Sequence, residues 1–74
     1  MKITINLYAT FRVGRFDKEQ REVLEGITLR NIIDEVGIAE GDIGMSLVNG
    51  CHAPMERVLR DGDTIFLFPM LAGG

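Results

Sequence analysis

The residues best suited to chemistry are the last two, Gly73 and Gly74. As a chain terminus, Gly74 presents a carboxylate, and a terminal carboxyl group has an ordinary pKa of about 3.5, so it is an anion and a poor electrophile at neutral pH. It must therefore be activated before it reacts. Because glycines have no Cβ atom, both residues can enter a narrow channel in another protein and adopt unusual backbone angles. We expect Gly74 to be the reacting residue, and a side chain at either position to block entry.

A glycine-rich end also has a plain structural explanation, because chain ends are often poorly ordered and tolerant of change. A mobile tail usually follows a polar linker, whereas this one directly follows the apolar run from Ile65 to Ala72. We therefore predict a folded domain over residues 1–70 and a flexible diglycine tail over residues 71–74, held out from a rigid body.

Other candidate reactive residues are weaker. Cys51 and His52 are neighbours, but neighbouring side chains on an extended chain point in opposite directions, so we do not expect them to act together. One cysteine can neither close an internal disulfide nor form a metal site by itself. Asp61 and Asp63 flank Gly62 in a turn pattern, where Asp side chains usually accept hydrogen bonds from nearby backbone amides. The sequence predicts no metal site, no bound cofactor and no complete active site.

Composition limits the kinds of partner. The 74 residues carry a net charge of −3, with 46% hydrophobic and 26% charged residues, which is ordinary for one folded domain. The excess negative charge argues against binding to a phosphate backbone and favours a basic protein surface. The longest apolar run is too short to cross a bilayer, and the first residues form a strand pattern rather than a signal peptide. With its lone cysteine, the chain is expected to be cytoplasmic and to bind neither nucleic acid nor membrane.

The first half of the chain predicts a hairpin followed by a helix. Residues 2–9 alternate, with Ile3, Ile5 and Leu7 on one side, as in a half-buried strand. Residues 10–19 form a long loop or a one-turn helix in this prediction. Residues 20–25 form a second short strand with Val23 or Leu24 inward.

The predicted helix follows this hairpin. Thr28 is suited to its N-cap and Gly37 to a left-handed C-cap. Between them, the apolar residues recur with the spacing of an amphipathic helix: Leu29, Ile32, Ile33 and Val36.

The second half predicts three further strands. Residues 38–44 form a connection over the sheet edge, residues 45–48 a strand, and Asn49-Gly50 a hairpin turn. Residues 51–59 form a short irregular strand interrupted by Pro54. The Asp61-Gly62-Asp63 turn leads into the last strand. Pairing of that strand is expected to stop at Pro69, which has no N–H to donate.

The last strand is apolar on both faces. If one parity of residues 65–68 packs under the helix, the other parity forms either a second covered core or an exposed apolar surface. We favour the exposed surface, because methionine and aromatic side chains suit protein interfaces. The candidate partner-binding residues are Phe66, Phe68, Pro69, Met70, Leu71, Ala72 and Gly73.

The order of these elements predicts an α+β fold in which one helix lies across one face of a mixed four- to five-stranded sheet, with the first and last strands adjacent. This arrangement is the ubiquitin-like β-grasp. Five stretches, spread over nearly the whole length, resemble the ThiS/MoaD sulfur-carrier family. They are Leu7-Tyr8-Ala9 leading to Phe11-Arg12, Val48-Asn49-Gly50, Leu59 to Ile65, Phe68-Pro69 and Gly73-Gly74.

Within that family, Phe68-Pro69 and the aromatic last strand are more similar to MoaD, the small subunit of molybdopterin synthase, than to ThiS. Val13-Gly14-Arg15 departs from the helical pattern usual in the MoaD loop. The resemblance implies that an E1-like adenylating enzyme uses ATP to activate Gly74 and that a sulfur donor protein then leaves a thiocarboxylate there. The MoaD-like interpretation implies a carrier without its own active site, which binds the large subunit of molybdopterin synthase.

Three alternatives stay open. The sulfur could go to the thiazole of thiamine, through a thiazole synthase, to a tRNA base or to another acceptor. The chain could be a protein modifier that Gly74 links to a lysine. It could also be a ubiquitin-like binding module that uses only its sheet face and does not need the last two residues.

Overall fold

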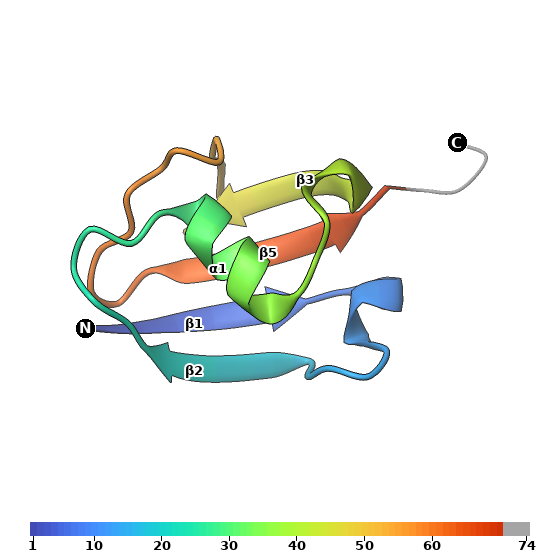
Figure 1. The fold of residues 1–74 in the computed structure, drawn as a ribbon, viewed down its shortest axis with the longest axis horizontal. Coiled ribbons are helices and arrows are strands. Elements are labelled where there is room, and N and C mark those ends of the chain that lie inside the picture. Colours follow the sequence, from blue (N-terminus) through green and yellow to red (C-terminus); the bar gives the residue numbers. More distant parts are fainter. Residues whose placement is uncertain (71–74) are drawn as a thin grey trace.

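The computed structural model describes residues 1–70, which form a five-stranded mixed sheet with one α-helix across one face (Figure 1). The strands lie in the order β2-β1-β5-β3-β4. The predicted α+β β-grasp is confirmed. Its elements in chain order are β1 (Lys2–Leu7), the 3-10 helix η1 (Ala9–Arg12), β2 (Lys18–Glu22), α1 (Leu29–Val36), the 3-10 helix η2 (Glu40–Asp42), β3 (Ile43–Val48), β4 (Cys51–His52) and β5 (Thr64–Pro69).

The two central strands come from opposite ends of the described chain. β1 and β5 run parallel, with Ile5 opposite Ile65 and Leu7 opposite Leu67, as predicted for the first and last strands. The other pairs, β1 with β2, β3 with β5 and β3 with β4, are antiparallel. β5 is therefore the middle strand of the sheet, and its last residue, Pro69, lies at one end of the sheet.

The core lies between the sheet and α1. The alternation predicted for β1 is confirmed, because Ile3, Ile5 and Leu7 are at most 1% exposed. The buried side chains of α1 and β5 complete this layer: Leu29, Ile32, Ile33, Ile65 and Leu67. We call this side of the sheet the inner face.

Both predicted helix caps are present. The Thr28 hydroxyl accepts a hydrogen bond from the Asn31 backbone N–H (3.3 Å), and the Asn31 side chain accepts one from the Thr28 N–H (3.0 Å). Gly37 ends α1 in the left-handed region with a φ of 85°. Because α1 has only eight residues, these caps and the inner-face packing hold a helix that would not persist alone.

The second strand forms the predicted hairpin with β1, but its bounds and its inward residues differ from the prediction. β2 covers Lys18–Glu22, and Leu24 is 84% exposed, whereas Val23 is partly buried beyond the strand end. The register of β2 against β1 directs Glu19 and Arg21 to the inner face, where their side chains form an ion pair of 2.7 Å. A strand at the sheet edge can place charged residues inward because water still reaches them. Of the two alternatives for residues 10–19, the one-turn helix is present as η1, which already starts at Ala9. β1 therefore ends at Leu7 and not at residue 9.

The strands of the second half differ from the prediction at two points. β3 starts at Ile43, inside the predicted connection, and its pairing with β5 is shifted by a bulge between Ile43 and Met45. The strand predicted over residues 51–59 is reduced to Cys51–His52. β5 ends at Pro69, as predicted, with Pro69 opposite Ile43. One further backbone bond follows the strand, from the Met70 N–H to the Asp42 carbonyl (2.9 Å) in η2.

Candidate functional site

Four of the predicted site residues, Leu71, Ala72, Gly73 and Gly74, lie outside the described residues, as does the predicted flexible tail. Met70, the last described residue, is 62% exposed. The candidate site is therefore built from the part of the domain that surrounds the end of β5.

Phe66 and Phe68 point to the sheet face opposite α1, which we call the outer face. Their neighbours Ile65 and Leu67 are fully buried on the inner face, whereas both phenylalanines are only partly buried. Tyr8 stacks on Phe68 with ring centroids 4.2 Å apart and lies 6.5 Å from Phe66. In the described chain no helix or strand lies over this face (Figure 1). A second covered core is therefore not formed by residues 1–70.

The neighbouring strand enlarges this aromatic row. The register of β3 with β5 places Met45 opposite Phe68 and Leu47 opposite Phe66, on the same face. All of these side chains are partly exposed. The outer-face patch is defined as Tyr8, Met45, Leu47, Phe66 and Phe68.

The other half of the outer face is polar. The register of β1 with β2 places exposed Lys18, Gln20 and Glu22 there, next to Asn6 and Thr4. The apolar character is thus confined to the side of the sheet that carries the end of β5.

A hollow of about 540 Å³ adjoins the outer-face patch at the point where the chain leaves β5. Its walls are largely apolar, which suits a partner's hydrophobic side chain. The lining residues are Tyr8, Ala9, Gly44, Met45, Phe68, Pro69 and Met70.

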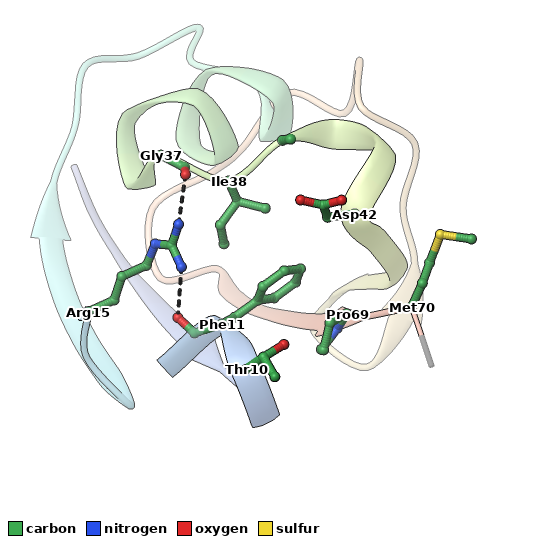
Figure 2. Close-up of a pocket in the computed structure, with 9 residues that line it drawn as sticks. Thr10, Phe11, Arg15, Gly37, Ile38, Asp42, Pro69 and Met70 are labelled. Atoms are coloured by element: carbon green, nitrogen blue, oxygen red, sulfur yellow. Dashed lines mark hydrogen bonds between the residues drawn. The ribbon is translucent and has the colours of Figure 1, made fainter. Parts of the chain in front are cut away.

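A second hollow, of about 450 Å³, reaches Pro69 and Met70 from the side of α1 (Figure 2). Arg15 forms one wall, since its Nη1 donates to the Phe11 carbonyl (3.2 Å) and its Nη2 to the Gly37 carbonyl (2.7 Å). Its Nε donates to the Val36 carbonyl (3.2 Å). Figure 2 shows this guanidinium joining the η1 loop to the end of α1. Met70, the last described residue, lines both hollows.

The η1 loop is also held from its other side. Arg12 Nε donates to the Leu7 carbonyl (2.7 Å), and its guanidinium carbon lies 5.3 Å from the centroid of the Tyr8 ring. Asp17 lies 3.6 Å from the same nitrogen. These contacts fix the loop that carries Tyr8 to the outer-face patch.

Cys51 and His52 do not form a catalytic pair. The register with β3 places His52 opposite Leu47 and Cys51 opposite Val48, so the two side chains belong to opposite faces, as predicted. Within residues 1–70, no three His, Cys, Asp or Glu side chains gather closely enough to hold a metal ion. No helix in this part of the chain has the length and apolarity needed to span a membrane.

Both aspartates accept backbone hydrogen bonds, as predicted, but only Asp63 does so within the turn. Asp61 accepts a hydrogen bond from the Lys2 N–H (2.8 Å). Asp63, which is 5% exposed, accepts hydrogen bonds from the Asn49 side chain (2.9 Å) and the Arg60 N–H (2.8 Å).

Three residues at the site were not identified from the sequence. Tyr8, Met45 and Leu47 reach the outer-face patch through the register of β1 and β3 with β5. The aromatic or apolar type of each was visible in the sequence, but only the strand pairing shows that they share a face.

Comparison with known proteins identifies the family. A family model described as Mut7-C ubiquitin matches residues 4–73, nearly the whole chain. Among the curated proteins, none matches this sequence. Among solved structures, a protein assigned as molybdopterin converting factor subunit 1 from Pyrococcus furiosus is 28% identical, with a TM-score of 0.77 over 96% of this chain and 99% of that chain.

Two more distant structures share the fold. Small archaeal modifier protein 1 from Haloferax volcanii is 20% identical, with a TM-score of 0.78 over 95% of this chain and 98% of that chain. A chain in the complex of subunits 1 and 2 of the molybdopterin-converting factor from Helicobacter pylori is 20% identical, with a TM-score of 0.67 and 100% of each chain covered. The chain therefore belongs to the Mut7-C ubiquitin family, with a ubiquitin-like β-grasp of the ThiS/MoaD type.

Proposed function

We propose that this chain is a sulfur carrier whose Gly74 is its carboxyl terminus and holds the sulfur as a thiocarboxylate. An E1-like enzyme joins the Gly74 carboxylate oxygen to the α-phosphate of ATP and releases pyrophosphate. A hydrosulfide equivalent from a sulfur donor protein then attacks the acyl carbon, displaces AMP and leaves the thiocarboxylate. The acceptor is the molybdopterin precursor, and ATP is bound by the activating enzyme.

The observation that carries this proposal is the outer-face patch, which leads directly to the end of β5. Tyr8, Phe66 and Phe68 remain partly exposed on a face that no described element covers. An apolar patch of this kind, rich in aromatic and methionine side chains, is typical of protein interfaces. A partner bound there has Met70 within its footprint, and the four following residues can reach at most about 14 Å further. Binding to the patch therefore brings the terminal carboxylate within reach of the partner's active site.

The proposed division of labour is that this domain binds and presents, while its partners supply the reactive groups. Cys51 and His52 face apart, and the buried carboxylate Asp63 is engaged by backbone and amide donors. The net charge of −3 favours a partner with a basic rim around an apolar centre. The need for ATP and for reduced sulfur supports the cytoplasm as the place of action.

The choice of molybdopterin as acceptor rests on similarity. The Pyrococcus furiosus protein, at 28% identity over nearly the full length of both chains, is assigned as subunit 1 of a molybdopterin converting factor. The Helicobacter pylori chain occurs in a complex with subunit 2. By analogy, we propose a molybdopterin synthase large subunit as the second partner of the outer-face patch.

Intact-mass measurement tests the proposal. Protein purified from its own cells is incubated with extract, ATP and a sulfur source, and its mass is measured with and without ATP. We expect a chain that ends at Gly74 and in which one oxygen is replaced by sulfur only when ATP is present. A native chain that continues past residue 74 without trimming, or one whose mass never changes, would contradict the carrier function. Delivery of the sulfur to thiazole or tRNA instead of molybdopterin would contradict the proposed acceptor and leave the carrier function in place.

A second candidate is a binding module that uses only the outer-face patch, and the exposure of that patch favours it independently of the tail. Deletion of Gly73 and Gly74 separates the two functions. A binding module keeps its partner and its cellular role after the deletion, whereas a carrier keeps the partner and loses the role.

A further inference from the structure

Gly44 lies in β3 against the backbone of Pro69 and Met70. A Cβ atom at this position would lie 2.8 Å from the Pro69 carbonyl oxygen, 3.0 Å from Met70 Cα and 3.1 Å from Met70 N. All three are backbone atoms, which cannot rotate away as the end of a side chain can. A residue with a side chain at position 44 would therefore push the end of β5 aside.

The need for glycine here is one of space and not of backbone angle. Five of the seven glycines in the described chain have positive φ angles and open space where a Cβ atom would lie, so their backbone angle alone explains them. Gly44 has no positive φ, and it is the only one of these seven at which a Cβ atom would have neighbours within 4 Å. Gly41 has neither a positive φ nor a close neighbour, which makes it a matched control.

The contact coincides with the last attachment of β5 to the sheet within residues 1–70. The bulge between Ile43 and Met45 leaves Gly44 out of the regular register. Immediately beside it, the Met70 N–H donates to the Asp42 carbonyl (2.9 Å). Because Pro69 has no N–H, this bond holds the final peptide of the described chain.

We propose that Gly44 is a positioning residue, which lets β3 approach Pro69 and Met70 closely enough to set the point from which the chain continues to Gly74. This inference rests on the proposed carrier function. Four residues span at most about 14 Å, so the position of Met70 limits where the terminal carboxylate can be placed in a partner's active site. A displacement of about 1 Å of a reacting group can cost about a hundredfold in rate.

The test compares Gly44→Ala with Gly41→Ala. Hydrogen exchange at the Met70 amide, followed by NMR, reports the bond to Asp42. Adenylation by the E1-like enzyme, followed as ATP-pyrophosphate exchange, reports the reaction. For Gly44→Ala we expect roughly tenfold faster exchange at Met70 and a kcat lowered at least about tenfold, because the terminal carboxylate is misplaced in the bound complex. The readout is kcat and not KM, because Gly44, Pro69 and Met70 also line the hollow beside the outer-face patch. Gly41→Ala should match the wild type in both measurements.

A second pair of variants covers the case in which Gly44→Ala does not fold. Met70→Pro removes the N–H that donates to Asp42, and it also replaces the side chain and fixes the φ angle. Met70→Leu replaces the side chain and keeps the N–H. We expect a loss of kcat for Met70→Pro relative to Met70→Leu. The positioning role alone is overturned if the wild-type chain is adenylated and Gly44→Ala has the same kcat as the wild type. If Gly44→Ala is unfolded, an equal kcat for Met70→Pro and Met70→Leu overturns it. A wild-type chain that is not adenylated overturns the carrier function and, with it, this role.

Discussion

Tyr8 and Phe68 stack face to face across the outer face of the sheet, with ring centroids 4.2 Å apart and an interplanar angle of 7°. The two residues are sixty positions apart in the chain, and the parallel pairing of β1 with β5 brings them together. The Tyr8 ring also contacts the Arg12 guanidinium, whose carbon lies 5.3 Å from the ring centroid. This stack gives the outer-face patch a rigid centre beside the end of β5, and rigid aromatic side chains are frequent interface hot spots.

Phe68→Ser should weaken binding to the E1-like enzyme. Removing a central aromatic side chain from an interface typically costs about 1–2 kcal/mol or more, so we expect KM for the carrier to rise about tenfold or more with kcat nearly unchanged. Gln20→Ser, on the polar half of the same face, is the control and should leave KM within about twofold. Urea unfolding of both variants separates lost binding from lost folding. An unchanged KM in a folded Phe68→Ser variant would exclude the patch as the docking surface.

Gly73→Val and Gly74→Val should each abolish adenylation, because a branched side chain cannot follow the narrow path that two glycines can take. Both positions lie beyond the described domain, so the urea midpoint should equal that of the wild type. ATP-pyrophosphate exchange and intact mass are the measurements. An adenylated valine variant would show that the terminal residues do not enter a narrow channel.

Asp63→Ala should destabilise the domain by about 2–3 kcal/mol, because it removes the buried carboxylate that accepts hydrogen bonds from the Asn49 side chain and the Arg60 N–H. Asp61→Ala, in the same turn, loses one exposed bond to the Lys2 N–H and should cost about 1 kcal/mol or less. Urea unfolding at neutral pH measures both. Equal losses in the two variants would mean that burial of Asp63 does not decide its contribution.

Arg15→Ala should loosen the end of α1. The side chain donates to the Val36 and Gly37 carbonyls, which have no partner inside the helix, and its charge complements the helix dipole. We expect a loss of about 1–2 kcal/mol in the free energy of unfolding and faster hydrogen exchange in the last turn of α1. Arg15→Lys, which keeps the charge and can reach one carbonyl, should lose about half as much. No difference between the two variants would mean that the charge contributes nothing and that the guanidinium geometry carries the whole effect.

Local signals were sufficient for much of the fold. The alternation of Ile3, Ile5 and Leu7, the Thr28 cap, and the left-handed Gly37 are each determined by a few neighbouring residues, and all three were predicted from the sequence. Asn49-Gly50 likewise adopts the paired positive φ angles of a two-residue hairpin turn.

The second strand could not be located by apolar alternation, because its inward residues are Glu19 and Arg21. These two charged residues form an ion pair on the inner face, where the sheet edge leaves them accessible to water. Their inward position depends on the register with β1, which local sequence does not show. The apolar residues Val23 and Leu24 led instead to a predicted strand that starts at residue 20, two residues after the observed start at Lys18.

The partial exposure of Phe66 and Phe68 on one face of the sheet agrees with the prediction, which missed the other residues of the outer-face patch. The parity of β5 identified Phe66 and Phe68, but Met45 and Leu47 join them through the register of β3. Gly44 carries no local signal at all, since its contact is with Pro69 and Met70, which follow it by more than twenty positions. Close approaches of this kind become visible only when the chain has been folded in space.

The parallel pairing of β1 with β5 also determines how the domain bears force. A force applied to the carboxyl end while Met1 is held would load the parallel strands β1 and β5 in shear. In shear, the hydrogen bonds between β1 and β5 bear the force together and must break together, instead of breaking one after another. If the proposed carrier function holds, the domain should resist unfolding when a partner pulls on its carboxyl end.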